Sequence, residues 1–472
     1  MFARYPDYSV IVSRFAYAMK AALQTLGMSQ RILMVLVGTF ALLASNPAIA
    51  SDFDIFGVNP IGIAEASSRV AGADDGSASY YNPGGLALGE GYKLDVSANG
   101  MLSEISAQSE RASIDDPYGG TMTVAADVPL KGVLKDRIRF GVATHAMTSG
   151  LMRVKLRKSV DPFFPYYDNR TQRIVVIPAL SARIANGLGV GVSVNALAGV
   201  RGDVDVRDGQ SRSLEPRIVQ NAGTVFRWIV GARFDWSERV RIGAAYRQSF
   251  GVPLDIGTTA DIAGTSLSVD ITKAEALFDP ATVVVGVRVL PVEGVALELD
   301  AAYHNWSRWE GPALGISTTA SAMVLTSRAS EGMFTDTMSA RLAAAWTVGK
   351  NSVREVSLHV GSGYETTMLD GSKRQGETNH IDGAKLIFGL GVAMRFPGLV
   401  GEAFRVGLGA QLHHVARMQN DKITCTALPC PVGTVAGTDA TDPSAGVSNP
   451  GYPSLEGGGS IIVGAIGIGV DL

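Results

Sequence analysis

The sequence lacks long apolar runs. After Ser51 no uninterrupted stretch reaches the roughly 20 apolar residues that a membrane-spanning helix needs, although 46% of the 472 residues are hydrophobic. This absence argues against a helical membrane protein. The chain has 55 glycines and few charged residues, which is typical of a large β-protein whose apolar residues are separated by alternation.

The sequence also lacks signs of catalysis or nucleic-acid binding. Its net charge of -3 gives no basis for a nucleic-acid partner. No G-x-S-x-G motif occurs, and GLGVGV at 187–192 lacks the spacing of a phosphate-binding loop, so its glycines are better explained as small residues on a crowded wall. His413 and His414 would point to opposite faces of a strand, which disfavours a shared metal. We expect no enzyme, no metal and no cofactor; a hydrolase site scattered over several strands is the alternative.

The first fifty residues are organised like an export signal. An apolar run at 32–44 follows Lys20 and Arg31 and precedes an A-x-A sequence at 48–50. This order predicts a signal peptide, residues 1–50, that is cleaved before Ser51. Because the apolar run is shorter than a spanning helix requires, the alternative of a membrane anchor is disfavoured.

Cysteine is scarce. Cys425 and Cys430 are the two cysteines of the chain and lie in a loop-like segment rich in Thr, Gly and Pro. In an exported chain such a close pair predicts a small loop disulfide, with two unpaired thiols as the alternative. The pair would staple a loop and carry no chemistry.

Alternation with a period of two repeats along the rest of the chain. Leu386, Phe388 and Leu390 share one face of a predicted strand, and Gly389 and Gly391 share the other. Many such segments exceed ten residues, whereas strands in soluble proteins are commonly five or six residues long. About 9 to 11 tilted residues span a bilayer, with apolar residues toward lipid and polar or small residues toward the lumen. The pattern predicts an all-β fold, a transmembrane antiparallel β-barrel.

Short and long connections should alternate between the periplasmic and the outer side of such a barrel. This rule gives about 14 strands. They are expected at 91–101, 120–129, 137–147, 171–185, 187–201, 222–236, 238–250, 280–290, 293–305, 335–348, 353–365, 382–396, 402–414 and 459–472. We interpret the strand-like pieces at 264–273 and 151–160 as extensions of outer hairpins. Trp236, Tyr246, Tyr303 and Trp346 lie toward strand ends, as aromatic girdles require.

Residues 51–90 precede the first predicted strand and lack long amphipathic periodicity. A barrel of this size leaves an open channel unless something fills it. We therefore predict an N-terminal hatch at 51–90 inside the lumen of a barrel at 91–472; a periplasmic linker is the alternative. The NPGG sequence at 82–85 would form a tight turn in the lumen, where glycine permits close backbone approach and proline fixes the chain direction.

Three stretches resemble a known family. The sequence ADDGSASYYNPGGLA at 73–87 resembles the hatch motif, commonly DDASAxYYNPAGLA, of the outer-membrane long-chain fatty acid transporter family of FadL and TodX type. The stretch at 278–309 is similar to the paired strands of that family that end in W-S-x-W/F, here Trp306 to Trp309, and 177–199 is a weaker match.

The resemblance implies a fourteen-stranded barrel that carries hydrophobic compounds across the outer membrane. Long-chain fatty acids are the leading substrate, and aromatic or alkane hydrocarbons are the alternative. Outer loops would capture the ligand, a lumenal pocket would receive it, and a shift of the hatch would release it laterally through the wall. By motif, the gating role falls on Asn82, Pro83, Gly84 and Gly85, with Gly84 where the family usually has alanine.

The predicted lumen is net basic. Its candidate ligand-binding residues are Arg137, Arg139, Arg173, Arg183, Arg227, Arg233, Arg241 and Arg247. A local basic bias favours a ligand with an apolar body and a carboxylate. For any single arginine, a purely structural ion-pair network is the alternative.

Two outer loops carry apolar clusters. The candidate capture residues are Phe163, Phe164, Tyr166, Tyr167, Met323, Leu325 and Phe334. Exposed apolar clusters mark binding sites, with loop packing or contact with lipopolysaccharide as alternatives. Gly141 is the candidate for a kink in the wall, because glycine permits bulges.

The leading hypothesis is a passive, monomeric transporter in the outer membrane of a Gram-negative bacterium. Its expected partners are a hydrophobic ligand, outer-membrane lipid and lipopolysaccharide, and the outer-membrane assembly machinery. A general porin and a surface receptor or adhesin, with the loop at 415–458 as its working part, are the rival functions.

Overall fold

The computed structural model describes much of the chain after residue 52. The described residues are 53–107, 110–111, 118–148, 162–168, 174–208, 214–262, 265–309, 311, 315–320, 323–326, 334–351, 353–370, 379–421, 423–425, 434–436 and 454–472. The predicted signal peptide, the segment 151–160, Arg173 and Cys430 lie outside this set. None of the helices formed by the described residues is both long and apolar enough to cross a membrane.

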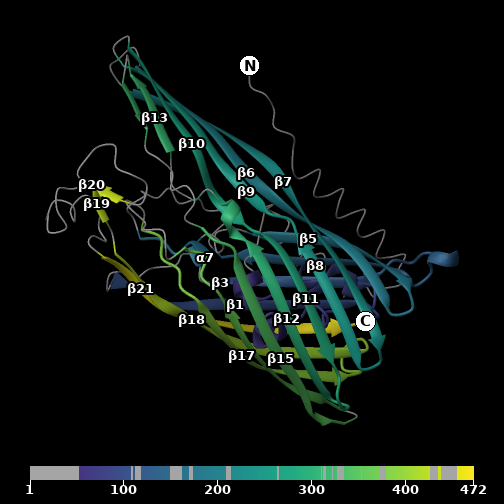
Figure 1. Ribbon diagram of the computed structural model, residues 1–472. Coiled ribbons are helices and arrows are strands. Elements are labelled where there is room, and N and C mark those ends of the chain that lie inside the picture. Colours follow the sequence, from purple (N-terminus) through teal and green to yellow (C-terminus); the bar gives the residue numbers. More distant parts are fainter. Residues whose placement is uncertain are drawn as a thin grey trace. The chain divides into compact units, whose positions relative to one another are not determined.

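Fourteen antiparallel strands of the described chain close into a barrel (Figure 1). They are β1 (Lys93–Ala107), β3 (Tyr118–Asp127), β4 (Ile138–Met147), β5 (Val175–Ala185), β6 (Leu188–Asp208), β7 (Leu214–Ser237), β8 (Val240–Arg247), β11 (Ala281–Val289), β12 (Val295–Asn305), β15 (Thr337–Lys350), β16 (Glu355–Glu365), β17 (Lys385–Pro397), β18 (Ala403–Asp421) and β21 (Ser454–Asp471). Each pairs with the next one named. The ring closes because β21 also pairs with β1, from Lys93 opposite Asp471 to Ala107 opposite Gly457. The predicted barrel is confirmed.

Further described strands lie outside the ring of fourteen. Five of them extend the outer ends of the wall: β2 (Glu110–Arg111), β9 (Phe250–Ile262), β10 (Thr265–Asp279), β13 (Gly315–Ala320) and β14 (Met323–Thr326). The other two, β19 (Ile423–Cys425) and β20 (Thr434–Ala436), pair in parallel with each other in a separate sheet. β9 pairs in parallel with the end of β6, and β10 pairs with both β9 and β13. The strand-like piece at 264–273 is therefore part of an outer hairpin, as expected, and does not change the number of wall strands.

Side-chain exposure follows the predicted alternation. On β7, Trp228 and Trp236 are 51% and 70% exposed, whereas Arg227 and Arg233 are 2% and 1% exposed. The four aromatic residues expected in girdles are all exposed: Trp236, Tyr246, Tyr303 and Trp346. The wall therefore turns a large apolar surface outward, as a bilayer-spanning barrel requires.

Residues 53–90, here called the N-terminal segment, form short helices. They are α3 (Phe53–Phe56), α4 (Pro60–Ala64), α5 (Ala78–Tyr81) and α6 (Pro83–Leu86). Two of them begin alike: Asn59 caps α4 and Asn82 caps α6, each followed by a proline in the first turn. The NPGG sequence is thus a capped helix start rather than a bare tight turn.

The N-terminal segment contacts wall strands that lie far apart around the ring. α4 packs against β16, β17, β18 and β21, whereas α6 packs against β5, β6 and β7. Nearly all of the segment is buried. In Figure 1 it is the purple stretch among the wall strands.

Candidate functional site

Inward-facing glycines let the backbone of the N-terminal segment approach the wall closely. A Cβ atom added at Gly191 would lie 2.4 Å from the Pro83 carbonyl oxygen, and one added at Gly409 would lie 2.1 Å from the Pro60 carbonyl oxygen. Real Cβ atoms essentially never approach that closely, so any side chain would displace the segment. We call these wall positions the glycine belt: Gly189, Gly191, Gly231, Gly243, Gly286, Gly361, Gly389, Gly391 and Gly409. The belt agrees with the interpretation of GLGVGV as part of a crowded wall.

The NPGG residues make the tightest contacts on the β6 and β7 side. Asn82 is fully buried, and its side-chain amide donates to the carbonyl oxygens of Val70 (2.7 Å) and Ala232 (2.9 Å). Its side-chain oxygen accepts from the Gly84 N–H at 3.0 Å. A Cβ at Gly84 would lie 2.6 Å from Ala232 Cα, and one at Gly85 2.2 Å from the Ala73 carbonyl oxygen. Alanine at position 84, usual in the motif that this stretch resembles, does not fit this geometry without a shift.

Carboxylates of β12 hold the backbone between α4 and α5. Glu298 accepts from the N–H groups of Ala71 (2.8 Å) and Gly72 (2.9 Å), and Asp300 accepts from the Val70 N–H at 3.2 Å. Glu298 also binds Arg288 of β11 at 2.8 Å. Three consecutive backbone donors are therefore paired with acidic side chains of the wall.

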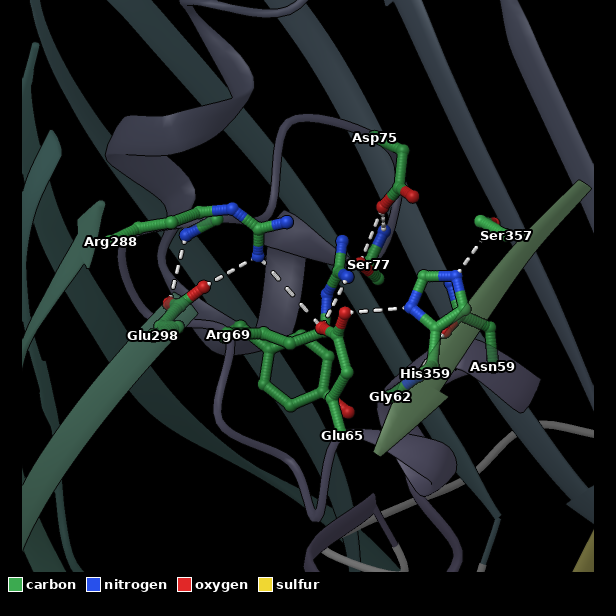
Figure 2. Close-up of polar contacts among 12 residues, drawn as sticks. Asn59, Gly62, Glu65, Arg69, Asp75, Ser77, Arg288, Glu298, Ser357 and His359 are labelled. Atoms are coloured by element: carbon green, nitrogen blue, oxygen red, sulfur yellow. Dashed lines mark hydrogen bonds and ion pairs between the residues drawn. The ribbon is translucent and has the colours of Figure 1, made fainter. Parts of the chain in front are cut away.

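Glu65, at the end of α4, links the N-terminal segment to two sides of the wall (Figure 2). Its carboxylate lies 2.8 Å from Arg69, 2.8 Å from His359 Nδ1 of β16 and 3.9 Å from Arg288. Burial by itself would raise the pKa of Glu65, but Arg69, His359 and Arg288 outweigh it and lower the pKa to about 2. Glu65 is therefore ionised, so His359 Nδ1–H donates to it, and Nε2 of the ring lies 2.9 Å from the Ser357 hydroxyl.

Most candidate lumen arginines have protein partners. Arg183, Arg233 and Arg247 donate to backbone carbonyl groups of the N-terminal segment. The ion pairs of the candidate set are Arg139 with Asp127, Arg227 with Asp279, Arg233 with Asp235, and Arg241 with Asp74. Arg137 lies before β4 begins and is exposed. The structural alternative thus accounts for many of these residues, and their role toward a ligand stays a prediction.

Aromatic side chains from several outer loops meet in one buried cluster. Phe163 and Phe164 precede α7 (Pro165–Asp168), while Trp306 and Trp309 lie in or beside the 3-10 helix η2 (Trp306–Arg308). The aromatic cluster consists of Phe163, Phe164, Tyr166, Tyr167, Phe278, Trp306, Trp309 and Phe334. Trp309 stacks on both Phe278 and Phe334, with ring centres 5.7 and 4.5 Å apart.

The expectation that the capture residues are exposed is wrong for the aromatic members. Phe163, Phe164, Tyr166, Tyr167 and Phe334 are at most 5% exposed. They are buried because the two loops, which we expected to form separate clusters, pack on each other and on Trp306 and Trp309. Met323 and Leu325 lie in β14, and their side chains are outside the described set. A capture role for all seven residues stays a prediction.

The same apolar core reaches the N-terminal segment. It includes Ile55 and Phe56 of α3, Ile63 of α4, and Met101 and Ile105 of β1. Contacts between apolar side chains are therefore continuous from the outer loops to the N-terminal segment.

Two buried cations border the aromatic cluster. Lys385 Nζ lies 4.2 Å from the centre of the Tyr166 ring and 2.9 Å from Asp382. Arg341 lies 3.6 Å from Glu365, which accepts from the Tyr166 hydroxyl at 3.1 Å. At the edge of the aromatic cluster, ion-paired side chains therefore lie next to the aromatic rings.

No kink is found at Gly141. β4 pairs with β3 and with β5 through this position without a register shift. A Cβ at Gly141 would instead lie 2.7 Å from the Ser79 hydroxyl, so close packing explains the glycine. A register shift of the outer wall occurs between β18 and β21, at Val415 and Met418.

Neither family models nor curated proteins match the sequence. Solved structures do. A Pseudomonas aeruginosa FadL homologue superimposes with a TM-score of 0.55 at 13% identity, covering 90% of this chain and 98% of that one. The barrel has the fold of FadL and TodX. The Pseudomonas putida toluene transporter TodX gives 0.51 at 12% identity, covering 88% and 98% of the two chains. The Ralstonia pickettii toluene transporter TbuX gives 0.50 at 14% identity, covering 89% and 100%.

Proposed function

We propose that the protein is a passive transporter of hydrophobic compounds in the outer membrane of a Gram-negative bacterium. The observation that carries this proposal is the unbroken apolar core between the outer loops and the N-terminal segment, inside a wall whose outer surface is also apolar. The likeness in fold to a FadL homologue and to two toluene transporters supports the same class. We take the chain to act as a monomer that is inserted by the outer-membrane assembly machinery and surrounded by lipid and lipopolysaccharide.

In the proposed mechanism, outer loops capture the ligand and the aromatic cluster receives it by exchanging ring contacts for ligand contacts. The N-terminal segment acts as a hatch with Asn82, Pro83, Gly84 and Gly85 at its tightest point. Because the segment and the wall are in close contact at the glycine belt, release requires the hatch to shift. Lateral release through the wall is the proposed exit.

Long-chain fatty acids are the first candidate substrate. Lys385 and Arg341 border the aromatic cluster, where a carboxylate could exchange with Asp382 or Glu365 while the chain lies among the aromatic rings. Aromatic hydrocarbons are the second candidate. The stacked rings of Phe278, Trp309 and Phe334 favour them, because a neutral ring can replace one of these contacts without unpairing a charge.

Uptake of labelled oleate and of labelled toluene tests the proposal. A strain deficient in outer-membrane transport would express the wild type, an Asn82→Ala, Pro83→Ala variant or a Lys385→Met variant. Leu390→Ala, on the lipid-facing side of β17, is the matched control. Oleate uptake that is lost in both variants supports hatch-gated fatty acid transport, and toluene uptake that survives Lys385→Met moves the substrate to hydrocarbons.

The same strains separate the rival functions. A general porin predicts uptake of small hydrophilic solutes and an ion conductance typical of open channels. An adhesin predicts that deletion within 415–458 abolishes function while the hatch variant leaves it intact. Uptake of neither oleate nor toluene by a folded wild-type barrel contradicts the proposed transport of these substrates.

A further inference from the structure

A cavity lies away from the aromatic cluster, beneath helix α4. Its volume is about 190 Å³, and residues 59–61 form one side. The other side is the wall, from β1, β16, β17, β18 and β21. Glu355 begins β16 and Arg405 lies near the start of β18, so both are next to short connections. The aromatic loops join the opposite ends of the strands. The cavity is therefore at the inner end of the barrel.

The wall beside Pro60 is less closely packed at this cavity than in the glycine belt. A Cβ at Gly407 would lie 3.3 Å from Pro60 Cβ, and one at Gly467 would lie 3.1 Å from Pro60 Cγ. In the glycine belt the corresponding distances to the N-terminal segment are shorter, as at Gly409, where 2.1 Å separates it from the Pro60 carbonyl oxygen. The wall beside α4 thus leaves a space that a small molecule can fill.

Several polar groups of the cavity already have protein partners. Arg405 binds Asp95 at 3.2 Å and Asp471 at 2.9 Å, and Arg395 binds Asp471 at 3.3 Å. His359 has both ring nitrogens within hydrogen-bond distance of protein groups, Glu65 and Ser357. Glu355 adds a further carboxylate to the lining. A charged ligand would have to break these pairs, and an anion would also meet Glu355.

Apolar surface completes the lining. Pro60 and Ile61 contribute from α4, and Ala393 and the glycines Gly407 and Gly467 contribute from the wall. An apolar cavity of about 150 Å³ is large enough to hold a benzene molecule. The space beneath α4, at about 190 Å³, has room for one substituted ring and is too small for an extended long chain.

We propose that this cavity binds one small, neutral hydrophobic molecule of the size of a single aromatic ring. The inference rests on the proposed transport of hydrophobic compounds and deepens it. It assigns a second ligand site at the inner end of the barrel, beyond the glycine belt as seen from the aromatic cluster. A ligand that comes to it from the aromatic cluster would have to pass α4, which would give a path toward the short connections beside the lateral one.

Crystals of the full-length protein soaked in bromobenzene test the site, because anomalous scattering locates bromine directly. The filling variant is Ala393→Phe, with Ala393→Leu as a milder version if the first does not fold. Leu390→Phe, three residues away on the lipid-facing side of the same strand, is the matched control. We expect a bromine peak beneath α4 in the wild type and the control, and loss of that peak in the filling variant.

Two results would overturn the site. One is the absence of bromine beneath α4 in the wild type when the aromatic cluster or the lipid-facing surface is labelled. The other is an unchanged peak in the Ala393→Phe crystals. Neither depends on transport: cells that take up neither toluene nor oleate contradict the proposed function, while the soaked crystals still decide whether the cavity binds a ring.

Discussion

The two capped helices of the N-terminal segment begin with the same Asn-Pro pair but meet the wall differently. Asn82 makes contacts to its own helix, to Val70 and to the wall residue Ala232. Among the described residues, the Asn59 side chain forms one hydrogen bond, accepted within α4 from the Gly62 N–H at 2.8 Å, and a cavity lies beside it. The local sequence therefore sets where each helix starts, whereas distant wall residues determine how tightly that start is held.

One test adds a single methyl group to the wall beside α6 or beside α4. A Cβ at Gly231 would lie 2.2 Å from the Asn82 side-chain oxygen, whereas a Cβ at Gly407 would lie 3.3 Å from Pro60. Gly231→Ala should therefore displace α6 at a cost of about 1 to 3 kcal/mol, and Gly407→Ala, which requires Pro60 to move by only a few tenths of an ångström, should cost less. Hydrogen exchange of amides 53–90 and conductance in planar bilayers measure the displacement.

In that experiment Gly231→Ala should lose exchange protection and raise the conductance relative to the wild type. Similar exchange protection and similar conductance in the two alanine variants would contradict the expected difference between the wall contacts of α6 and those of α4.

A difference is also expected between the two caps. Asn82→Ala leaves the carbonyl groups of Val70 and Ala232 and the Gly84 N–H without this partner, which should cost roughly 2 to 4 kcal/mol in total. Asn59→Ala removes one capping bond, worth about 1 kcal/mol. Thermal unfolding of the purified barrel and exchange of the N-terminal amides report both. Equal losses for Asn82→Ala and Asn59→Ala would argue against wall anchoring of α6.

Much of the wall could be predicted from the sequence, because alternation records which face meets lipid and which meets the interior. All fourteen expected strands are found near their expected positions. β6 and β7 run further than expected, to Asp208 and from Leu214. A bilayer-length criterion stops such strands too early, because backbone pairing continues outside the membrane.

The site was harder to predict, because its contacts join residues far apart in the chain. Glu65 and His359 are 294 positions apart, and neither lies in a periodic pattern that would single it out. The aromatic loop residues were identified by composition, but exposure depends on whether loops pack on each other, which composition does not record. Trp306 and Trp309 carried a signal only through the family resemblance.

The smallest effect concerns pH and the α4 side. The pKa of Glu65 is about 2 in the folded protein against about 4.5 when unfolded, so its ion pairs stabilise the fold fully above pH 4.5. This contribution is lost as the pH falls from 4.5 through 2. Protection of amides in α4 should therefore decline over that window, ahead of amides in α6, whose Asn82 contacts do not titrate. In Glu65→Gln the pH dependence of α4 should flatten, and an unchanged decline would show that another group is responsible.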